Sequence, residues 1–390
     1  MAGLQAAPLA GLRVVELAHV ASGPFAGMLL ADLGADVVKF EPPSGDMMRG
    51  WPPVETGPDG TPYSHNFASL NRNKRSISLD LKDADDLSLA KELIGTADVV
   101  VENYRPGALD KLGLGYRDVS VLNETVIYCS VSGYGQQGPF ATRAAFDVTI
   151  QAASGLMSVT GEEDGGPVKC GVPVADFVAG LYAVVSVLAS LRGRDRDDRS
   201  VYIDCSMLGS LLGVSALQTS EYFGTGRVPA RLGTAHPRNA PYQAFTGSDR
   251  PFVMAAGNDR MWADLCKLLG QQDLIDDERF ATQATRATNH RELAAILNDA
   301  MRSRTADDWI EVLDDAGIAC APVNDVAEAL DDPATAALDL IRELHLPNGI
   351  VTRTIAYPVA MSTHRSEVAL DPPSLGAHRD EVVTDWLGGG

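Results

Sequence analysis

The chain has 390 residues, 45% of them hydrophobic and 22% charged, which is typical of a globular protein with two or three domains. Its formal charge of −20, from 52 acidic and 32 basic residues, argues against nucleic acid and anionic membranes as partners. Five scattered cysteines without a C-x-x-C pair favour a reducing, cytoplasmic compartment and argue against a metal site. Residues 1–13 do not have the pattern of a signal peptide, and we see no stretch approaching the roughly 20 apolar residues of a membrane span.

The first 224 residues alternate short apolar runs with helical patterns. Strands are predicted at Leu12–Leu17, Ala35–Glu41, Ala97–Glu102, Thr125–Val131 and Ser200–Cys205, and helices at Phe25–Leu33, Asp176–Leu191 and Met207–Gln218. Strand, helix and strand at this spacing indicate βαβ units with a parallel sheet. We therefore expect an α/β fold whose large, Rossmann-like domain begins with residues 1–224.

The composition and the pattern of predicted elements change after residue 224. An irregular segment rich in Gly, Arg, Pro and Thr leads to a strand at Pro251–Ala256, followed by charged helical segments at Asp259–Leu269, Arg291–Met301 and Ala306–Ala316. This pattern predicts a small α+β domain at 225–325. The apolar run Ile350–Val359 in the remaining segment, 326–390, predicts a return to the large domain.

Three segments could bind an anion. The turn HVASGPFAG lacks the G-x-G-x-x-G spacing of a dinucleotide site, although a helix start there still offers N–H groups. The basic run NRNKRSISLDLK (71–82) is balanced between a solvated loop with a strand and an anion site. The segment ENYRPGALDKLGL (102–114) follows a strand, where ligands of open α/β sheets bind. No histidine has a spaced partner, and no metal site is visible.

One carboxylate, Asp176, stands in the uncharged run GVPVADFVAGLYA (171–183). At the start of an apolar helix it could be an N-cap. A carboxylate in poorly hydrated surroundings could also attack an activated acyl group, and Gly180 would let another backbone or a ligand come close. Taken alone, the local pattern favours the N-cap, and periodicity does not settle the choice.

Several motifs in order resemble one family over essentially the whole chain. They are PLAGLRVVEL, GPFAGMLLADLGADVVKFEPPSGDMMRGW, NRNKRSISLDLK, VENYRPGALDKLGLGY, SVSGYGQQGP, ASGLMSVTG, GVPVADFVAGLYA and HPRNAPYQAF. Together they resemble the class III (CaiB/BaiF-type) CoA transferases, a group that also contains α-methylacyl-CoA racemases. The resemblance implies an interlocked homodimer whose subunits each have a Rossmann-like domain built from both termini and a small middle domain.

The resemblance also implies the site. Asp176 matches the nucleophile that forms aspartyl anhydride and aspartyl-CoA thioester intermediates, and Asp147 matches an acidic residue near it. The positions that match contacts to coenzyme A are His19, Ser22, Lys39, Leu79, Lys82, Asn103, Tyr104, Lys111 and Met207. No metal is required, because each anhydride conserves the activation of the thioester.

The choice between transfer and racemisation depends on one position. Racemases of the family carry a histidine where this chain has Phe146, so we favour CoA transfer over acyl-CoA racemisation or a non-catalytic CoA-binding role. Because the chain lacks a glycine-rich loop, formyl-CoA and oxalate chemistry is disfavoured. We expect succinyl-CoA as donor and a small dicarboxylate as acceptor, with Arg49 and His236 as candidates to bind a distal carboxylate.

Overall fold

The computed structural model describes residues 7–197, 199–365 and 367–388, and the chain divides into two compact units. The large unit comprises Met1–Leu156, Lys169–Arg227 and Asp339–Gly390, and the small unit comprises Met157–Val168 and Val228–Leu338. The ends of the predicted domain ranges, residues 1–6 and 389–390, lie outside the described residues. The division at 224 and 325 stays a prediction of where independent domains end.

The large unit is built on a six-stranded sheet in the order β5-β2-β1-β6-β7-β8, in which every neighbouring pair is parallel. The strands are β1 (Arg13–Leu17), β2 (Asp36–Glu41), β5 (Lys74–Ser78), β6 (Val99–Glu102), β7 (Ile127–Ser132) and β8 (Val201–Ser206). The predicted α/β class and parallel sheet are thus confirmed. The strand order reverses between β1 and β6, as it does in a doubly wound nucleotide-binding sheet.

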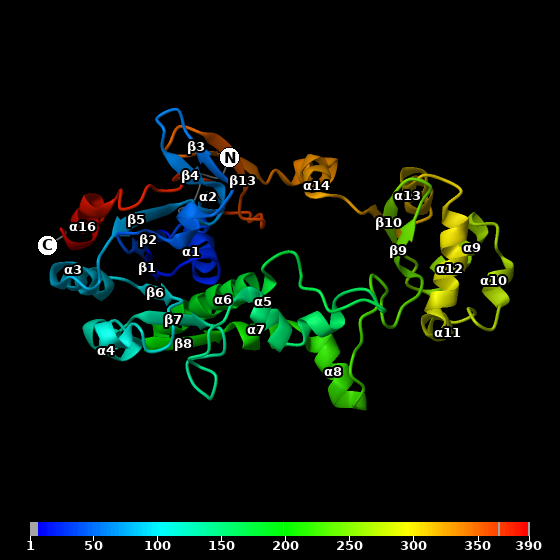
Figure 1. The fold of residues 1–390 in the computed structure, drawn as a ribbon, viewed down its shortest axis with the longest axis horizontal. Coiled ribbons are helices and arrows are strands. Elements are labelled where there is room, and N and C mark those ends of the chain that lie inside the picture. Colours follow the sequence, from blue (N-terminus) through cyan, green and yellow to red (C-terminus); the bar gives the residue numbers. More distant parts are fainter. Residues whose placement is uncertain (1–6, 198, 366, 389–390) are drawn as a thin grey trace. The chain divides into compact units, whose positions relative to one another are not determined.

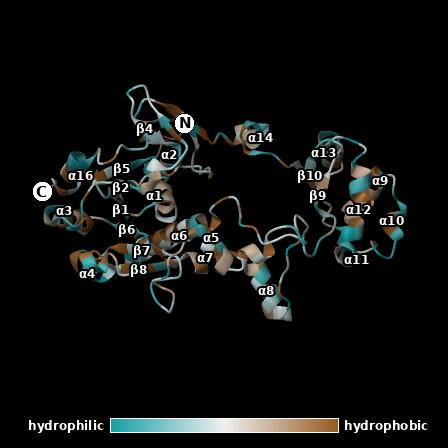
Figure 2. Cartoon of the chain, in the orientation of Figure 1, coloured by the Kyte–Doolittle hydropathy of each residue, from teal (hydrophilic) through white to brown (hydrophobic). Residues whose placement is uncertain are grey.

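Alternate residues of these strands face two separate hydrophobic clusters, because successive side chains of a strand point to opposite faces. On one face, residues such as Val14 and Val99 pack with α1 (Ser22–Asp32), α2 (His65–Asn71), α6 (Val174–Asp197) and α7 (Met207–Val214). On the other face, residues such as Val15 and Val100 pack with α3 (Ala84–Gly95), α4 (Tyr116–Leu122) and α16 (Arg379–Leu387). Figure 2 shows the apolar strands β7 and β8 in brown.

The chain leaves β1 and β6 toward opposite faces of the sheet. Helix α1, which follows β1, belongs to the first cluster, and α4, which follows β6, belongs to the second. This arrangement opens a crevice outside the carboxyl ends of β1 and β6, the usual ligand position in such sheets.

The C-terminal segment returns to the first strands, as Figure 1 shows by the red α16 beside the blue β5. The Arg75 guanidinium of β5 pairs with Asp36 at 2.5 Å and with Asp385 of α16 at 2.8 Å. Arg72 pairs with Asp32 at 2.6 Å, and its side chain is buried. The arginines of the basic run 71–82 are therefore neither on a solvated loop nor in an open anion site, because Arg72 and Arg75 form ion pairs with acidic residues of the same unit.

The remaining elements of the large unit are short. They are the hairpins β3 (Val54–Thr56) with β4 (Pro62–Ser64) and β12 (Ile341–His345) with β13 (Val351–Ile355), the helices α5 (Asp147–Ala153) and α8 (Ala216–Thr225), and the 3-10 helices Met47–Gly50 and Asp110–Leu112. The single helix predicted at Met207–Gln218 is wrong: α7 and α8 are separated at Ser215. There the Ser215 hydroxyl donates to the Leu211 carbonyl oxygen at 2.8 Å, and its amide is shared between two carbonyls.

The small unit has its own core. An antiparallel sheet, β11-β10-β9, is formed by β9 (Tyr242–Thr246), β10 (Pro251–Ala255) and β11 (Ala319–Pro322). Its helices are α9 (Asp259–Leu268), α10 (Asp273–Asp276), α11 (Gln283–Thr288), α12 (His290–Met301), α13 (Ala306–Asp315), α14 (Val326–Asp331) and α15 (Pro333–Leu338). Phe252, Trp262 and Trp309 are buried between the sheet and the amphipathic helices.

Helix α6 corrects one statement made from the sequence. Its segment Val174–Arg194 is long and apolar enough, by length and composition, to cross a membrane, whereas we saw no such stretch. In the large unit this helix packs against α1, α7, β7 and β8, and 33% of its most apolar stretch is buried, so one face of the helix joins the core.

Candidate active site

The loops after β1 and β6 are joined to each other at the crevice. The His19 amide donates to Asn103 Oδ1 at 2.9 Å, and Asn103 Nδ2 donates to the His19 carbonyl oxygen at 2.8 Å. Beside this junction lies a cavity of about 380 Å³, which is within the range of small-molecule sites. Seven of the predicted site residues line it: His19, Ser22, Asn103, Tyr104, Asp147, Asp176 and Met207.

Asp176 reaches the cavity because α6 approaches the start of α1 very closely. A Cβ atom at Gly180, one turn after Asp176, would lie 3.0 Å from the Ser22 carbonyl oxygen and 2.8 Å from Phe25. Only glycine allows this contact. The close approach that the sequence suggested for Gly180 is therefore a backbone contact, and it brings Asp176 beside Ser22.

The surroundings of Asp176 disfavour its charge. Burial, and then the neighbouring Asp147 carboxylate, raise its pKa to about 6, while a hydrogen bond from the Ser22 side chain opposes the shift. Asp176 lies in the first turn of α6, where the helix dipole favours a negative charge. The carboxyl group is still mostly ionised at pH 7, so it is a carboxylate held in a poorly hydrated place.

Asp147 begins α5 and connects it to the start of α6. Its Oδ1 accepts a hydrogen bond from the Ala175 amide at 2.8 Å, and its Oδ2 accepts one from Gln151 Nε2 at 2.7 Å. Asp147 thus caps the helix that carries Asp176. Phe146 lines the same cavity, and no titratable group stands at its position.

His19 is held by a hydrogen bond at one ring nitrogen. Its Nε2 lies 3.0 Å from the Tyr104 hydroxyl, and its Nδ1 lies 4.0 Å from Asp46. Burial and the nearby Lys39 ammonium lower the pKa of His19. The ring is therefore neutral at pH 7 and can exchange hydrogen bonds with a ligand.

Lys39 lies behind the cavity and does not line it. Its ammonium group is fully buried, 2.8 Å from Glu16, 3.0 Å from Asp46 and 2.6 Å from the Ala18 carbonyl oxygen. These partners raise the pKa of Lys39 against the opposing effect of burial. Through Asp46, which accepts a hydrogen bond from the Val20 amide, Lys39 supports the loop that carries His19.

Five other predicted residues also lie outside the cavity lining. Leu79 is buried in a core cluster, whereas Lys82 and Lys111 are exposed. Arg49 donates to both oxygens of Glu41 and to the Pro373 carbonyl oxygen, and its guanidinium covers the Phe67 ring. His236 belongs to the small unit, where it stacks on Tyr242. Their ligand contacts stay predictions.

Sequence reasoning missed two features of this site. Val20, which lines the cavity, has a φ of 65°, a strained conformation for a β-branched residue that the Asp46 carboxylate helps to hold. Arg143 also lines the cavity. The single signal for Arg143 was its place four residues before Asp147.

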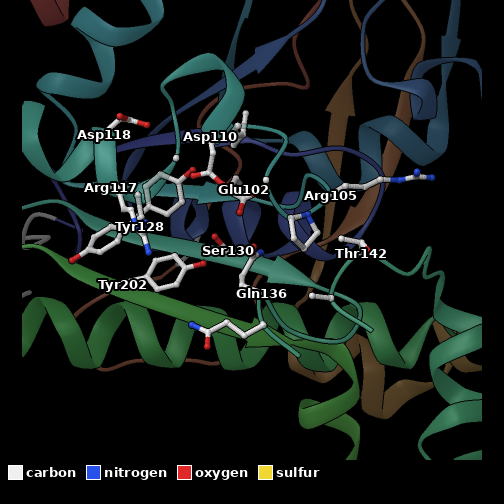
Figure 3. A pocket seen from close by; sticks show the side chains of 17 residues that line it. Glu102, Arg105, Asp110, Arg117, Asp118, Tyr128, Ser130, Gln136, Thr142 and Tyr202 are labelled. Atoms are coloured by element: carbon white, nitrogen blue, oxygen red, sulfur yellow. The ribbon is translucent and has the colours of Figure 1, made fainter. Parts of the chain in front are cut away.

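A second cavity of about 720 Å³ adjoins the first and shares Arg105, Pro106 and Ala141 with it. It contains Tyr128, Tyr202 and the buried Glu102, whose pKa burial raises to about 7 (Figure 3). Among the described residues, no group of three or more His, Cys, Asp or Glu side chains is arranged to hold a metal ion.

A poorly hydrated carboxylate beside a crevice of a doubly wound sheet can attack an activated acyl group without ATP. The model of CoA-transferase family III matches residues 9–379, and the chain belongs to this family. It is a class III CoA-transferase acting on acyl-CoA.

Similar proteins agree with this assignment. The chain is 39% identical to a succinate–glutarate CoA-transferase of Agrobacterium fabrum, over 97% of this chain and 95% of that protein. It is 38% identical to an acetyl-CoA:oxalate CoA-transferase of Acetobacter aceti, over 86% of this chain and 85% of that protein. The crystal structure of a CaiB/BaiF family protein from Brucella suis superposes with a TM-score of 0.87 at 39% identity, covering 97% of this chain and all of that one.

Proposed function

We propose that the protein transfers CoA from succinyl-CoA to a small dicarboxylic acid, with Asp176 as the nucleophile. The observation that carries the proposal is the position of Asp176, a largely ionised carboxylate with a raised pKa in a cavity that seven predicted site residues line. Both relatives named above act on dicarboxylic acids, which supports the substrate class. The sequence disfavoured oxalate as an acceptor, and the similarity to the oxalate enzyme adds oxalate to the acids to be tested.

The first half-reaction loads CoA onto the enzyme. An Asp176 oxygen attacks the thioester carbonyl of the donor, the C–S bond breaks, and a mixed anhydride and CoA thiolate form. The thiolate then attacks the aspartyl carbonyl, which gives the aspartyl-CoA thioester and releases the donor acid with one oxygen from Asp176.

The second half-reaction reverses these steps with a different acid. The acceptor carboxylate attacks the aspartyl thioester, and the released thiolate attacks the acceptor carbonyl of the new anhydride. The products are the acceptor acyl-CoA and the Asp176 carboxylate. The Ser22 hydroxyl and the amides of Ser22 and Gly23 at the start of α1 are the candidate donors for each tetrahedral oxyanion, because the first amides of α6 already donate within the fold.

The remaining residues of the site take supporting roles in this proposal. Asp147 positions α6, and His19, Ser22, Asn103, Tyr104 and Met207 contact the pantetheine end of CoA in the cavity. Lys82 and Lys111, which are exposed cations in an acidic chain, meet the phosphates. Lys39 and Leu79 support the cofactor site from the core.

We further propose that the protein is a cytoplasmic, interlocked homodimer. Large apolar side chains are exposed along three successive helices of the large unit, which supports an interface between copies; they include Leu181, Val185, Leu212, Leu217 and Phe223. The free cysteines, three of them buried, are compatible with a reducing compartment. Light scattering of the purified protein would test the dimer.

Incubation with succinyl-CoA and a panel of carboxylic acids tests the proposed reaction. Mass spectrometry should find new CoA thioesters, and a CoA adduct on Asp176 when no acceptor is added. The isosteric Asp176→Asn variant should form neither. A wild-type protein that gives no adduct and no exchange with any acid would refute the proposal.

A further inference from the structure

A second carboxylate on the substrate needs a cation in the cavity. Transfer of an unpaired carboxylate from water into a poorly hydrated site is costly. Here the carboxylate of Asp147 would repel it throughout the reaction, and that of Asp176 would do so while the donor binds. The residues that line the cavity include two cationic side chains, Arg105 and Arg143.

The guanidinium of Arg143 is available for such a contact. It lies 5.7 Å from the ring centroid of Tyr134 and 5.5 Å from that of Phe140, and it forms no ion pair with any described residue. The rings restrain its position without using its N–H groups. By contrast, Arg49, the arginine that the sequence favoured, already donates to Glu41 and Pro373.

Arg105 is placed differently. It directly follows Asn103 and Tyr104, both predicted to contact CoA, and it lines both cavities. In Figure 3 its guanidinium lies on the side away from Tyr128 and Tyr202. An arginine beside the cofactor segment is open to CoA itself, whereas Arg143 lies on the loop between β7 and α5, four residues before Asp147.

We propose that Arg143 binds the distal carboxylate of the dicarboxylic acid and so determines the preference of the enzyme for dicarboxylates over monocarboxylates. This inference rests on the proposed function and adds the residue that selects the substrate. A guanidinium can donate two parallel hydrogen bonds to one carboxylate, so the interaction fixes direction as well as charge. A monocarboxylate of equal length leaves the guanidinium unmatched and gains none of this energy.

The test compares glutarate with pentanoate, which has the same carbon chain and lacks one carboxylate. With succinyl-CoA as donor, kcat/KM for the acceptor reports only the reaction of the aspartyl-CoA form. We expect Arg143→Gln to lower kcat/KM for glutarate by about 10- to 100-fold, the value of a charge-assisted hydrogen bond, and to change that for pentanoate by less than about threefold. Arg143→Lys should retain part of the preference.

Arg117→Gln is the matched control, because Arg117 is an exposed arginine that lines the second cavity and not the first. It should leave both values unchanged. An equal fall for glutarate and pentanoate in Arg143→Gln, or no fall for either, would overturn the assignment. If the proposed function itself is wrong, the wild type fails with every acid and forms no adduct on Asp176, which is a different result.

Discussion

Two groups of charged side chains lie within the same large unit, one fully buried and the other at a cavity, and they differ in how they are paired. In the first, Glu16 lies 2.8 Å from Lys39 and 2.8 Å from Lys74, and all three side chains are fully buried. In the second, Asp147 and Asp176 face a cavity without a cation paired to either of them among the described residues. A carboxylate that is fully paired with cations, such as Glu16, stabilises the fold. A carboxylate without a paired cation, such as Asp176, is available to react.

The pKa shifts follow this difference. The ammonium groups of Lys39 and Lys74 lower the pKa of Glu16 in spite of its burial, so it stays ionised. Burial and Asp147 raise the pKa of Asp176 to about 6. The folded protein therefore disfavours the charged form of Asp176, as the environments of reactive carboxylates often do.

The largest expected effect is the loss of activity in Asp176→Asn. Removal of the proposed nucleophile should lower kcat by at least about a thousandfold. Among the described residues that line the cavity, the other carboxylate is Asp147, and it is already engaged in capping α6. The rate of CoA exchange between succinyl-CoA and labelled succinate measures this. Retention of more than a tenth of the rate would contradict the role of Asp176.

The same variant should be more stable than the wild type at pH 8. A carboxyl group whose pKa rises from 3.8 to about 6 on folding favours the folded state below pH 3.8 and loses this contribution as pH rises through 6. Two pKa units correspond to ~3 kcal/mol as an upper limit. Denaturation by urea should show a gain for Asp176→Asn at pH 8 and none at pH 3.5, and a loss at pH 8 would contradict the electrostatic account.

The paired group should respond in the opposite way. Glu16→Gln leaves two buried ammonium groups next to each other, so the free energy of unfolding should fall by about 3–5 kcal/mol. Glu343→Gln is the control, since Glu343 is exposed on β12, and it should change stability by less than about 0.5 kcal/mol. Equal stability of the two variants would show that the buried network is not structural.

Close contacts at two glycines link helix α1 to both groups. Gly27 of α1 packs on Glu16, and Gly180 of α6 packs on Ser22 of α1. Gly180→Ala should push α6 away and lower kcat by about 10- to 100-fold, because a shift near 1 Å disturbs a reactive group. Gly193→Ala, on the same helix, should keep full activity, since a Cβ atom at Gly193 would have nothing within 4 Å. Equal activities would show that the close approach is dispensable.

The smallest expected effect concerns pH. Activity should fall as pH drops through about 6, where Asp176 becomes protonated. Asp147→Asn keeps an oxygen that can cap Ala175 but removes the nearby negative charge, so the acid limb of kcat/KM should move to lower pH. Asp118→Asn, in the second cavity, should leave the profile in place. A shift toward higher pH in Asp147→Asn would contradict the stated cause.

Much of the sheet could be predicted because its strands are apolar runs of the right length. Val99–Glu102 and Val201–Ser206 lie within a residue or two of their predicted bounds. The strand Lys74–Ser78 was ambiguous, because its cations are paired with acids far away in the sequence, such as Glu16 and Asp36. Local pattern cannot reveal such partners.

Some residues of the candidate site could be predicted from the sequence, and others depended on partners that only the fold reveals. Family motifs indicated Asp176 and Asn103, which the fold brings to one crevice. Arg49 was a reasonable choice for a substrate cation until its three-dimensional partner, Glu41, was known. Arg143 had only one local signal, its place four residues before Asp147, and the fold of its loop is what brings it to the cavity lining.

The central claim is that an oxygen of Asp176 takes part in every turnover, and isotope transfer tests this most directly. With succinyl-CoA and an acceptor acid labelled with ¹⁸O in its carboxylate, each complete transfer should leave one labelled oxygen on Asp176. Mass spectrometry of the peptide that contains residues 171–183 should then show one and later two heavy oxygens. Turnover that leaves this peptide unlabelled would contradict the account.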